Sequence, residues 1–183
     1  MNLIHCGDEA LAEAVDVLTR GGVAVIPTDT VYGLAAHPAF PDAVARLYTI
    51  KGRERRKKIA LLAADAASAE ACVGPLPSAA SALAAKHWPC ALTMVVGDEG
   101  VRVPDHAWTR RLLAACGGLL RVTSANLSGG RPATEVPQAL ADVGLSADLV
   151  VDDGPSPGGA PSTVVRVCGD GAIEVIRQGA VAI

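Results

Sequence analysis

Aromatic side chains are scarce in this sequence, and long apolar runs are missing. Phe, Trp and Tyr together make up only 3% of the 183 residues. A surface that binds RNA by base stacking needs exposed rings, so this scarcity argues against such a surface. No run of about 18 apolar residues occurs, so we expect no transmembrane helix. The first residues lack a basic region and a long apolar core, so we expect no signal peptide and a cytoplasmic protein.

Several motifs that bind nucleotides, metals or acyl groups are also missing. The sequence contains no G-x-x-x-x-G-K-[ST], no G-x-G-x-x-G after an expected strand and no G-x-S-x-G. The five cysteines are scattered and form no C-x-x-C pair, which is typical of idle thiols in a reducing compartment. His87 and Cys90 have a ligand-like spacing, but nothing nearby completes a metal set, so we predict no metal site. A bound nucleotide would therefore have its phosphates held mostly by side chains.

The apolar residues that are present predict one α/β domain over residues 1–183. Half of the residues are hydrophobic, and the length allows a sizeable core. Short apolar runs predict strands at 23–26, 59–63, 91–96, 101–103, 119–123, 149–151, 164–167 and 173–176. Helical patterns predict a helix that Asp8 caps and Gly21 ends, and further helices at 41–50, 65–72, 78–87, 107–116 and 136–143. Helices alternate with strands early and strands dominate late, which favours a mixed sheet with helices packed against it.

Polar segments follow two of the expected strands. One is the loop at 28–34, and the other is the turn at 124–130. In α/β proteins, ligands gather at the carboxyl ends of strands. Asp29 is a candidate general base, but an Asx-turn that holds its own loop is an equally good interpretation. His106 could belong to a site or cap the helix that follows it.

The strongest local feature is a cluster of positive charge at residues 51–58. This stretch contains six of the sixteen Lys and Arg residues and one Glu, while the whole chain has a net charge of −3. Such a cluster suits a polyanion such as a nucleotide triphosphate or an RNA backbone. A solvated helix end is the alternative, because the helix dipole favours cations there. If phosphates bind, Lys51, Arg53 and Lys57 are the candidate ligands.

Seven short motifs occur in the order in which they occur in the YrdC/TsaC family, the L-threonylcarbamoyladenylate synthases, and the sequence resembles that family from about residue 14 to residue 179. They are P-T-D-T-V-Y-G-L at 27–34, L-Y-x-x-K-G-R at 47–53, W-P-x-x-L-T at 88–93, V-R-x-P-x-H at 101–106, T-S-A-N-L-S-G at 123–129, P-S-T-V-V at 161–165 and I-R-x-G at 176–179. The resemblance implies a twisted mixed β-sheet with flanking helices around a deep, positively charged cavity.

The resemblance also implies a reaction and its participants. L-threonine, bicarbonate and ATP with Mg²⁺ would give threonylcarbamoyl-AMP and pyrophosphate. The product would pass to a threonylcarbamoyl-transferase complex that forms N6-threonylcarbamoyladenosine at position 37 of certain tRNAs. For the threonine pocket the resemblance implies Thr30, Tyr32, Arg102 and Ser162. For ATP it implies Lys51, Arg53, Lys57, Ser124, Asn126 and Arg177, with Lys51 and Arg53 also as the catalytic residues.

The sequence departs from the family pattern around the basic cluster. Glu54 and Lys58 stand where prolines are usual, and the link between Val96 and Val101 is shorter than in most relatives. These departures bear on nucleotide affinity more than on the threonine pocket. They leave room for a diverged carbamoyl-transfer paralogue. An RNA-binding YrdC-like module that uses residues 51–58 is a further hypothesis, whereas weak binding of the tRNA that is eventually modified is compatible with the enzyme itself.

Overall fold

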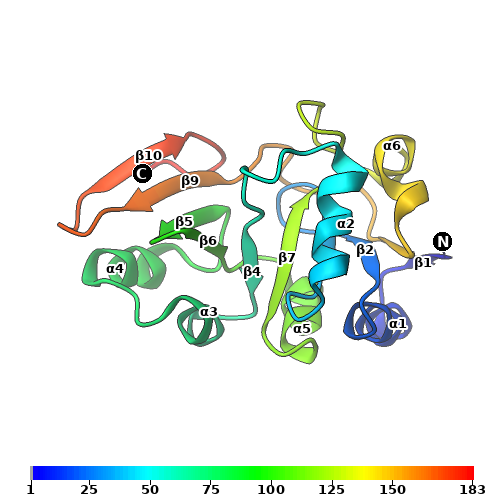
Figure 1. The fold of residues 1–183 in the computed structure, drawn as a ribbon, viewed down its shortest axis with the longest axis horizontal. Helices are drawn as coiled ribbons and strands as arrows, with labels where there is room; N and C mark the ends of the chain where they lie inside the picture. Colours follow the sequence, from blue (N-terminus) through cyan, green and yellow to red (C-terminus); the bar gives the residue numbers. More distant parts are fainter. Residues whose placement is uncertain (1) are drawn as a thin grey trace.

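The computed structural model describes residues 2–183, in which ten strands form one twisted mixed sheet flanked by helices (Figure 1). The strands are β1 (Asn2–His5), β2 (Val23–Ile26), β3 (Gly33–Ala36), β4 (Leu61–Ala63), β5 (Leu92–Val96), β6 (Glu99–Arg102), β7 (Leu119–Ser124), β8 (Leu149–Asp152), β9 (Thr163–Val167) and β10 (Ile173–Arg177). Their order is β1-β8-β2-β3-β7-β4-β6-β5-β9-β10, with both parallel and antiparallel pairs. The predicted mixed α/β sheet is confirmed.

The helices also lie close to the predicted ranges. They are α1 (Asp8–Thr19), α2 (Pro41–Lys51), α3 (Ala66–Val73), α4 (Ser78–His87), α5 (Ala107–Ala115), α6 (Val136–Asp142) and the 3₁₀ turn η1 (Gly144–Ser146). The predicted cap of α1 is wrong, because Gly7 occupies the N-cap position and Asp8 is the first helical residue. The Asp8 carboxylate instead pairs with Arg111 at 2.8 Å. A negative charge in the first turn is still favoured by the helix dipole.

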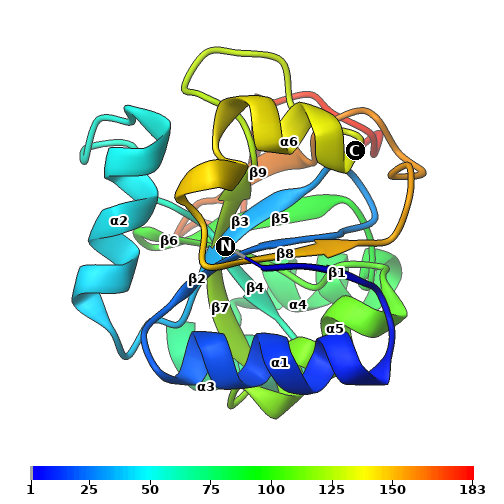
Figure 2. The same cartoon turned by 90° about the vertical axis from the view of Figure 1, so that its right-hand side faces the viewer.

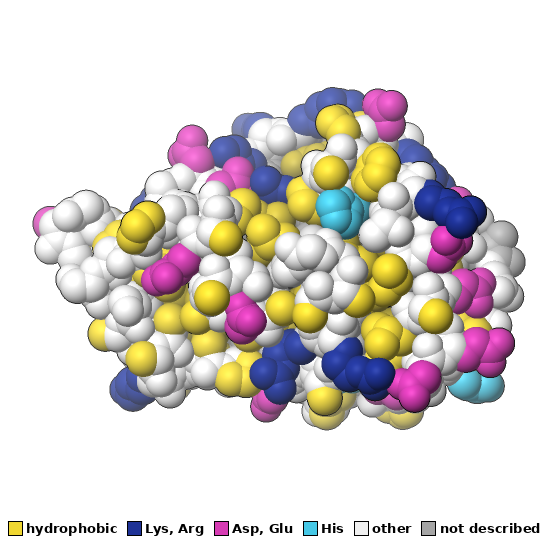
Figure 3. Space-filling model, turned by 90° about the horizontal axis from the view of Figure 1, so that it is seen from below, with side chains coloured by type: hydrophobic (Ala, Val, Ile, Leu, Met, Phe, Trp, Pro, Cys, Tyr) yellow, Lys and Arg dark blue, Asp and Glu magenta, His cyan; other side chains and the backbone are white. Residues whose placement is uncertain are grey.

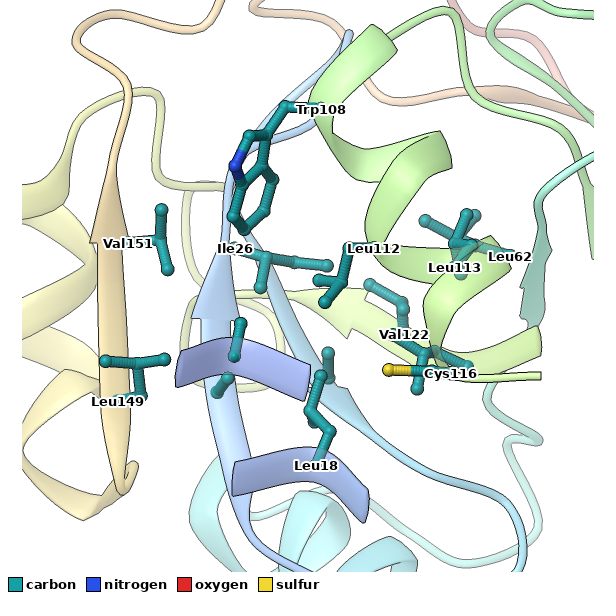
Figure 4. Close-up of a cluster of buried hydrophobic side chains, with 14 of the residues drawn as sticks. Leu18, Ile26, Leu62, Trp108, Leu112, Leu113, Cys116, Val122, Leu149 and Val151 are labelled. Carbon is teal, nitrogen blue, oxygen red and sulfur yellow. The ribbon is translucent and has the colours of Figure 1, made fainter. Parts of the chain in front are cut away.

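Residues on alternate sides of β2 enter different hydrophobic clusters. Ala24 and Ile26 pack in a cluster with α1 and α5, part of which is shown in Figure 4. Val23 and Val25 pack in a second cluster with α2 and α6. Figure 2 shows α1 and α5 below the sheet and α6 above it. All four β2 side chains are fully buried, and burying each Val or Ile side chain stabilises the fold by about 1.5–3 kcal/mol.

Helix α2 brings the basic cluster to the sheet. Pro41 lies in its first turn, where the missing N–H costs no helical hydrogen bond. Leu47 is buried against the sheet, and Gly52 ends the helix in the left-handed conformation with φ of 58°. Lys51 is therefore the last helical residue, and residues 53–58 form a loop that leads into β4. That strand begins at Leu61, two residues later than predicted.

The surface seen from below carries side chains of both charges among scattered hydrophobic ones (Figure 3). No single sign of charge dominates this face, so it lacks the footprint of a polyanion-binding surface.

Within residues 2–183, none of the helices is long and apolar enough to cross a membrane.

Candidate active site

A cavity of about 550 Å³ lies over the central strands of the sheet. Its wall takes residues from the segments around β3, β4, β5, β6, β7, β9 and β10. Eight of the ten predicted site residues line it: Thr30, Tyr32, Arg53, Arg102, Ser124, Asn126, Ser162 and Arg177. Residues that are far apart in the sequence thus meet because the strand order places their strands side by side.

Arg102 is the buried cation of the cavity, at only 5% exposure. Its Nε donates to the Cys90 carbonyl at 3.2 Å, and its Nη1 donates to Thr30 Oγ1 at 3.2 Å. Its Nη2 pairs with the Asp29 carboxylate. Burial lowers the pKa of the Arg102 guanidinium, and the nearby Asp29 carboxylate acts against that shift. The guanidinium is therefore fixed by three partners and keeps two further N–H groups for a ligand.

Two pairs of hydroxyl groups line the cavity together with Arg102. Thr28 Oγ1 lies 3.0 Å from Thr30 Oγ1, and Thr93 Oγ1 lies 2.9 Å from Ser162 Oγ. Thr28 also holds its loop, because its hydroxyl accepts from the Val31 N–H at 3.3 Å and donates to the Val31 carbonyl at 2.6 Å. The Asp29 carboxylate bonds to Arg102, so the loop is held by Thr28 and not by an Asx-turn of Asp29. A polar ligand with donors and acceptors would find partners for both at this end.

Tyr32 lines the cavity, and its hydroxyl is already hydrogen-bonded within the protein. Its side chain is fully buried, and its hydroxyl donates to the Gly154 carbonyl at 2.6 Å and accepts from the Asp153 N–H at 3.0 Å. Burial is the main cause that raises the pKa of Tyr32 to about 12, so the phenol stays protonated near neutral pH. These bonds fix the start of the 154–161 loop. The same loop is tied to the threonine-rich turn by Gly159, whose N–H donates to the Thr30 carbonyl at 2.9 Å.

Two further arginines, Arg53 and Arg177, line the cavity. Arg53 donates from Nε to the Lys57 carbonyl at 2.8 Å and from Nη2 to the Lys58 carbonyl at 3.1 Å. Arg177 donates from Nη2 to the Ser162 carbonyl at 2.7 Å. Burial lowers the pKa of Arg177, and the charge of Arg53 adds to this effect. Two guanidinium groups that repel each other favour an anion between them.

Lys51 lies behind the cavity wall and does not line it. It is 2% exposed, and its ammonium donates to the backbone carbonyls of Ser124 and Asn126. Its own carbonyl accepts from the Ser128 N–H at 2.8 Å. Burial, and secondarily the charge of Arg53, lowers the pKa of Lys51 to about 8. The structure thus gives Lys51 a part in holding the 124–130 turn, whereas the sequence predicts a phosphate ligand.

Lys57 also lies away from the cavity lining. Its side chain is 52% exposed, and its ammonium lies 3.4 Å from a carboxylate oxygen of Glu54. The Lys57 backbone carbonyl, not its charge, takes part in the site because it accepts a hydrogen bond from Arg53. The exposed loop at 53–58 therefore delivers only part of its charge to the cavity.

Asn126 presents an unsatisfied acceptor in the cavity wall. The residue is 4% exposed, and its Nδ2 donates to the carbonyls of Leu127 and Gly130 at 2.7 and 2.9 Å. Its Oδ1 is buried and has no partner within the described structure. A buried acceptor without a partner costs free energy, so the site favours a ligand that donates a hydrogen bond here. A hydroxyl or amine group fits this requirement, and a phosphate oxygen does not.

The cavity also contains five polar residues that the site prediction omits. Thr28, Thr93 and Thr123 lie within the quoted motifs, so their position in those motifs was an available signal. Lys58 and Asp98 gave no such signal, because they are forty residues apart and meet only where β4 and β6 pair. The Lys58 ammonium lies 3.7 Å from the Asp98 carboxylate. With these residues included, the charged side chains of the lining are four cations and one carboxylate.

His106 has the structural role that the sequence left open. Its Nδ1 accepts from the Thr109 N–H at 3.3 Å, which caps α5, and its Nε2 lies 3.0 Å from Asp153. Over residues 2–183, no group of three or more His, Cys, Asp or Glu side chains has the arrangement of a metal site. His87 and Cys90 accordingly have no third ligand beside them in that part of the chain.

Comparison with known proteins places this site in a family. The family model described as "Telomere recombination", which covers Sua5, YciO and YrdC proteins, matches residues 16–179. The chain belongs to the Sua5/YciO/YrdC family. This Sua5/YciO/YrdC chain is 35% identical over 171 residues to the threonylcarbamoyl-AMP synthase of Chromohalobacter salexigens, which covers 85% of this chain and 91% of that protein.

Two further relatives are longer than this Sua5/YciO/YrdC chain. The threonylcarbamoyl-AMP synthase of Bacillus subtilis is 32% identical over 193 residues, which is 97% of this chain and 56% of that protein. The structure of P. abyssi Sua5 complexed with L-threonine superposes with a TM-score of 0.88 at 25% identity, covering 97% of this chain and 57% of that chain. The chain thus spans a little over half the length of these two relatives.

Proposed function

We propose that this protein is an L-threonylcarbamoyladenylate synthase, which makes threonylcarbamoyl-AMP and pyrophosphate from L-threonine, bicarbonate and ATP. One observation carries the proposal: a single cavity joins a buried, hydroxyl-flanked Arg102 to the two further arginines Arg53 and Arg177. The first group suits the carboxylate and hydroxyl of threonine, and the second suits a triphosphate. The family membership and the names of the relatives support the same assignment.

The proposed roles follow the geometry of the cavity. Arg102 pairs with the threonine carboxylate, and Thr30 and Ser162 hydrogen-bond the amino acid. Tyr32 walls this pocket through its ring. Arg53 and Arg177 neutralise the triphosphate, and Asn126 accepts a hydrogen bond from a hydroxyl or amine group of the nucleoside. Ser124 contributes through the turn that it shares with Asn126, and Lys51 holds that turn in place.

The reaction needs placement more than a covalent nucleophile. The threonine ammonium first loses a proton. The resulting amine attacks bicarbonate carbon, and loss of water leaves a carbamate. A carbamate oxygen then forms a bond to the α-phosphorus of ATP while the bond to the β-phosphate oxygen breaks, so pyrophosphate leaves. The protein must hold both reactants, limit water and offset charge on the leaving group. The fixed cations and hydroxyls of the cavity supply the placement and the charge compensation.

Magnesium enters this proposal as part of the Mg–ATP substrate. The cavity lining offers one carboxylate, Asp98, and residues 2–183 contain no cluster of three metal-ligating side chains. That donor set fits an ion that is held mainly by phosphate oxygens, as Mg²⁺ usually is in phosphoryl-transfer sites. We propose a cytoplasmic reaction whose product serves the threonylcarbamoyl-transferase complex that modifies tRNA position 37.

The test is a pyrophosphate-release assay with each substrate omitted in turn. We expect pyrophosphate only when ATP, bicarbonate and threonine are all present. Mass spectrometry should detect threonylcarbamoyl-AMP in the complete mixture. Equal pyrophosphate release without threonine would reject the proposal, because an ATP-cleaving activity would then not need the amino-acid pocket.

The RNA-binding alternative has less support from the basic loop. Glu54 pairs with Arg56 and lies 3.4 Å from Lys57, while Lys58 lies near Asp98 and Arg53 lines the cavity. Much of the charge in residues 51–58 is therefore offset or directed inward. Weak, salt-sensitive binding of the tRNA substrate stays a prediction that a titration at low salt can check.

A further inference from the structure

A second hollow, of about 350 Å³, lies behind the proposed amino-acid pocket. Apolar side chains from the segment after α3, from α4 and from the end of β6 form much of its wall, including Leu76, Trp88 and Val103. Trp88 is held in place because its Nε1 donates to the Leu92 carbonyl at 2.8 Å. A fixed indole in a mainly apolar hollow is a suitable surface for an apolar ligand group.

The hollow also contains two charges that the protein leaves without partners. Arg110 and Glu70 both line it, and neither takes part in an ion pair within residues 2–183. The Arg110 Nε atom is buried and has no hydrogen-bond partner there. The third charged residue of the lining, Asp65, caps α3, because its carboxylate accepts from the Ser68 N–H at 2.7 Å. An unsatisfied buried donor favours a ligand that supplies an acceptor.

The apolar wall and the two charges of the hollow together determine which small ligands fit it. A simple carboxylate would pair with Arg110 but would lie near the Glu70 carboxylate, and a simple amine would supply no acceptor for the buried Arg110 Nε. A zwitterion offers one charge to each residue, and an apolar side chain would cover the hollow around Trp88. The chemistry of the lining therefore matches an amino acid with an apolar side chain.

The two cavities are joined through the segment that contains Trp88. Arg102 faces the first cavity, whereas the next residue, Val103, lines the second. Cys90 holds both positions: its carbonyl accepts from Arg102 Nε at 3.2 Å, and its N–H donates to the Val103 carbonyl at 3.0 Å. A ligand that displaces Trp88 or Val103 would therefore change the position of the Arg102 guanidinium.

We propose that the second hollow binds an apolar amino acid as its zwitterion and that its occupancy changes the binding of threonine at Arg102. The binding part of this inference is independent of the enzymatic activity. The regulatory part rests on the proposed function. The two parts are therefore tested by separate measurements.

Binding is tested with L-phenylalanine as the probe and tryptophan emission as the readout. Of the two tryptophans, Trp88 lines the hollow and Trp108 is buried in the core beside α1. We expect a saturable change in emission. The dissociation constant should be lower for phenylalanine than for 3-phenylpropanoate, which lacks the ammonium group, or 2-phenylethylamine, which lacks the carboxylate. Absence of a saturable change at millimolar concentrations would overturn the proposal.

Variants of neighbouring arginines provide the control. Arg110→Gln should weaken phenylalanine binding about tenfold or more, because a hydrogen bond to a charged group is lost. Arg111→Gln, on the same helix, should change it less than twofold, since Arg111 pairs with Asp8 at the surface. Glu70→Gln should remove the preference for phenylalanine over 3-phenylpropanoate. If Arg110→Gln does not fold, the Glu70→Gln variant still tests whether the ligand binds in this hollow. A signal lost in Arg102→Ala and kept in Arg110→Gln would place the ligand in the first cavity and overturn the proposal.

Coupling is tested by steady-state kinetics of pyrophosphate release. Saturating phenylalanine should change KM for threonine at least twofold in the unmodified protein and leave KM for ATP unchanged. The same addition should have no effect in Arg110→Gln. Binding by fluorescence without any change in KM would overturn the coupling. A protein that releases no pyrophosphate but shows Arg110-dependent fluorescence would instead reject the proposed function and leave the binding site standing.

Discussion

Asp29 and Arg102 form a buried ion pair between the loop after β2 and the last residue of β6. Their side chains are 9% and 7% exposed, and the pair joins residues that are 73 positions apart. The guanidinium is thus compensated before any ligand enters, and an incoming carboxylate must share it with Asp29. The pair also fixes the direction in which the remaining N–H groups of Arg102 point.

Replacing Asp29 by Asn should lower the free energy of unfolding by about 3 kcal/mol or more, because it leaves a buried guanidinium without its counter-charge. Urea unfolding of the two proteins measures the difference. Asp16→Asn is the matched control, since Asp16 pairs with Arg20 where both side chains are more than half exposed. The control should lose less than about 1 kcal/mol. Similar losses in both variants would show that the buried pair has no special weight.

Replacing Arg53 by Ala should reduce kcat/KM for ATP by about 10- to 100-fold, which corresponds to the loss of one or two hydrogen bonds to a charged group. The expected cause is loss of a guanidinium from the phosphate side of the cavity. Arg55→Ala removes a similar charge two residues away, from an exposed side chain outside the cavity lining. The kcat/KM of Arg55→Ala should stay within about twofold of that of the unmodified protein, because exposed charges contribute little. Equal losses would mean that the loop acts through its total charge.

Lys51 should make the stability of the protein depend on alkaline pH. Its folded pKa of about 8 lies below the usual 10.5, so the unfolded chain binds more protons between these values. The contribution of this residue to the free energy of unfolding should therefore rise with pH across that window. Relative to Lys51→Met, the unmodified protein should gain about 2 kcal/mol between pH 7.5 and pH 10. Urea unfolding at several pH values measures this gain, and a constant or falling difference would contradict it.

Gly179 should be required for the position of Ser162. A Cβ atom at this position would meet the Pro161 carbonyl oxygen and the backbone of Ser162, which cannot yield as a flexible side chain does. Gly179→Ala should cost about 1–3 kcal/mol of stability and raise KM for threonine more than KM for ATP. Gly169→Ala is the control, because a Cβ there meets nothing within 4 Å. Its effect should be within about 0.5 kcal/mol.

The strands that the sequence predicts are those with continuous apolar runs. β1 escapes prediction because it lies at the edge of the sheet and most of its side chains are exposed. β3 escapes because its residues, Gly-Leu-Ala-Ala, have little strand propensity. Only glycine fits at position 33, because a Cβ there would lie 2.5 Å from the Val122 side chain on the neighbouring strand. Tertiary packing, which no local pattern contains, determines both strands.

The site residues also divide into those that local motifs reveal and those whose position depends on tertiary contacts. The hydroxyl residues and Arg102, which the motifs single out, line one cavity because their strands end beside one another. The position of Lys51 could not be predicted, since its ammonium bonds to backbone carbonyls more than 70 residues away. A backbone carbonyl has no sequence signature, and a lysine next to arginines suggests phosphate binding whether or not it faces the ligand.

The cavity takes its wall from strands spread across most of the sheet, from β3 to β10. Any partial opening that separates two of these strands would also dismantle the pocket. Substrates bound there should consequently raise the melting temperature of the whole chain, by mass action on one cooperative unit. They should also slow amide hydrogen exchange in strands that never touch them, such as β1 and β8, provided that those amides exchange through global unfolding.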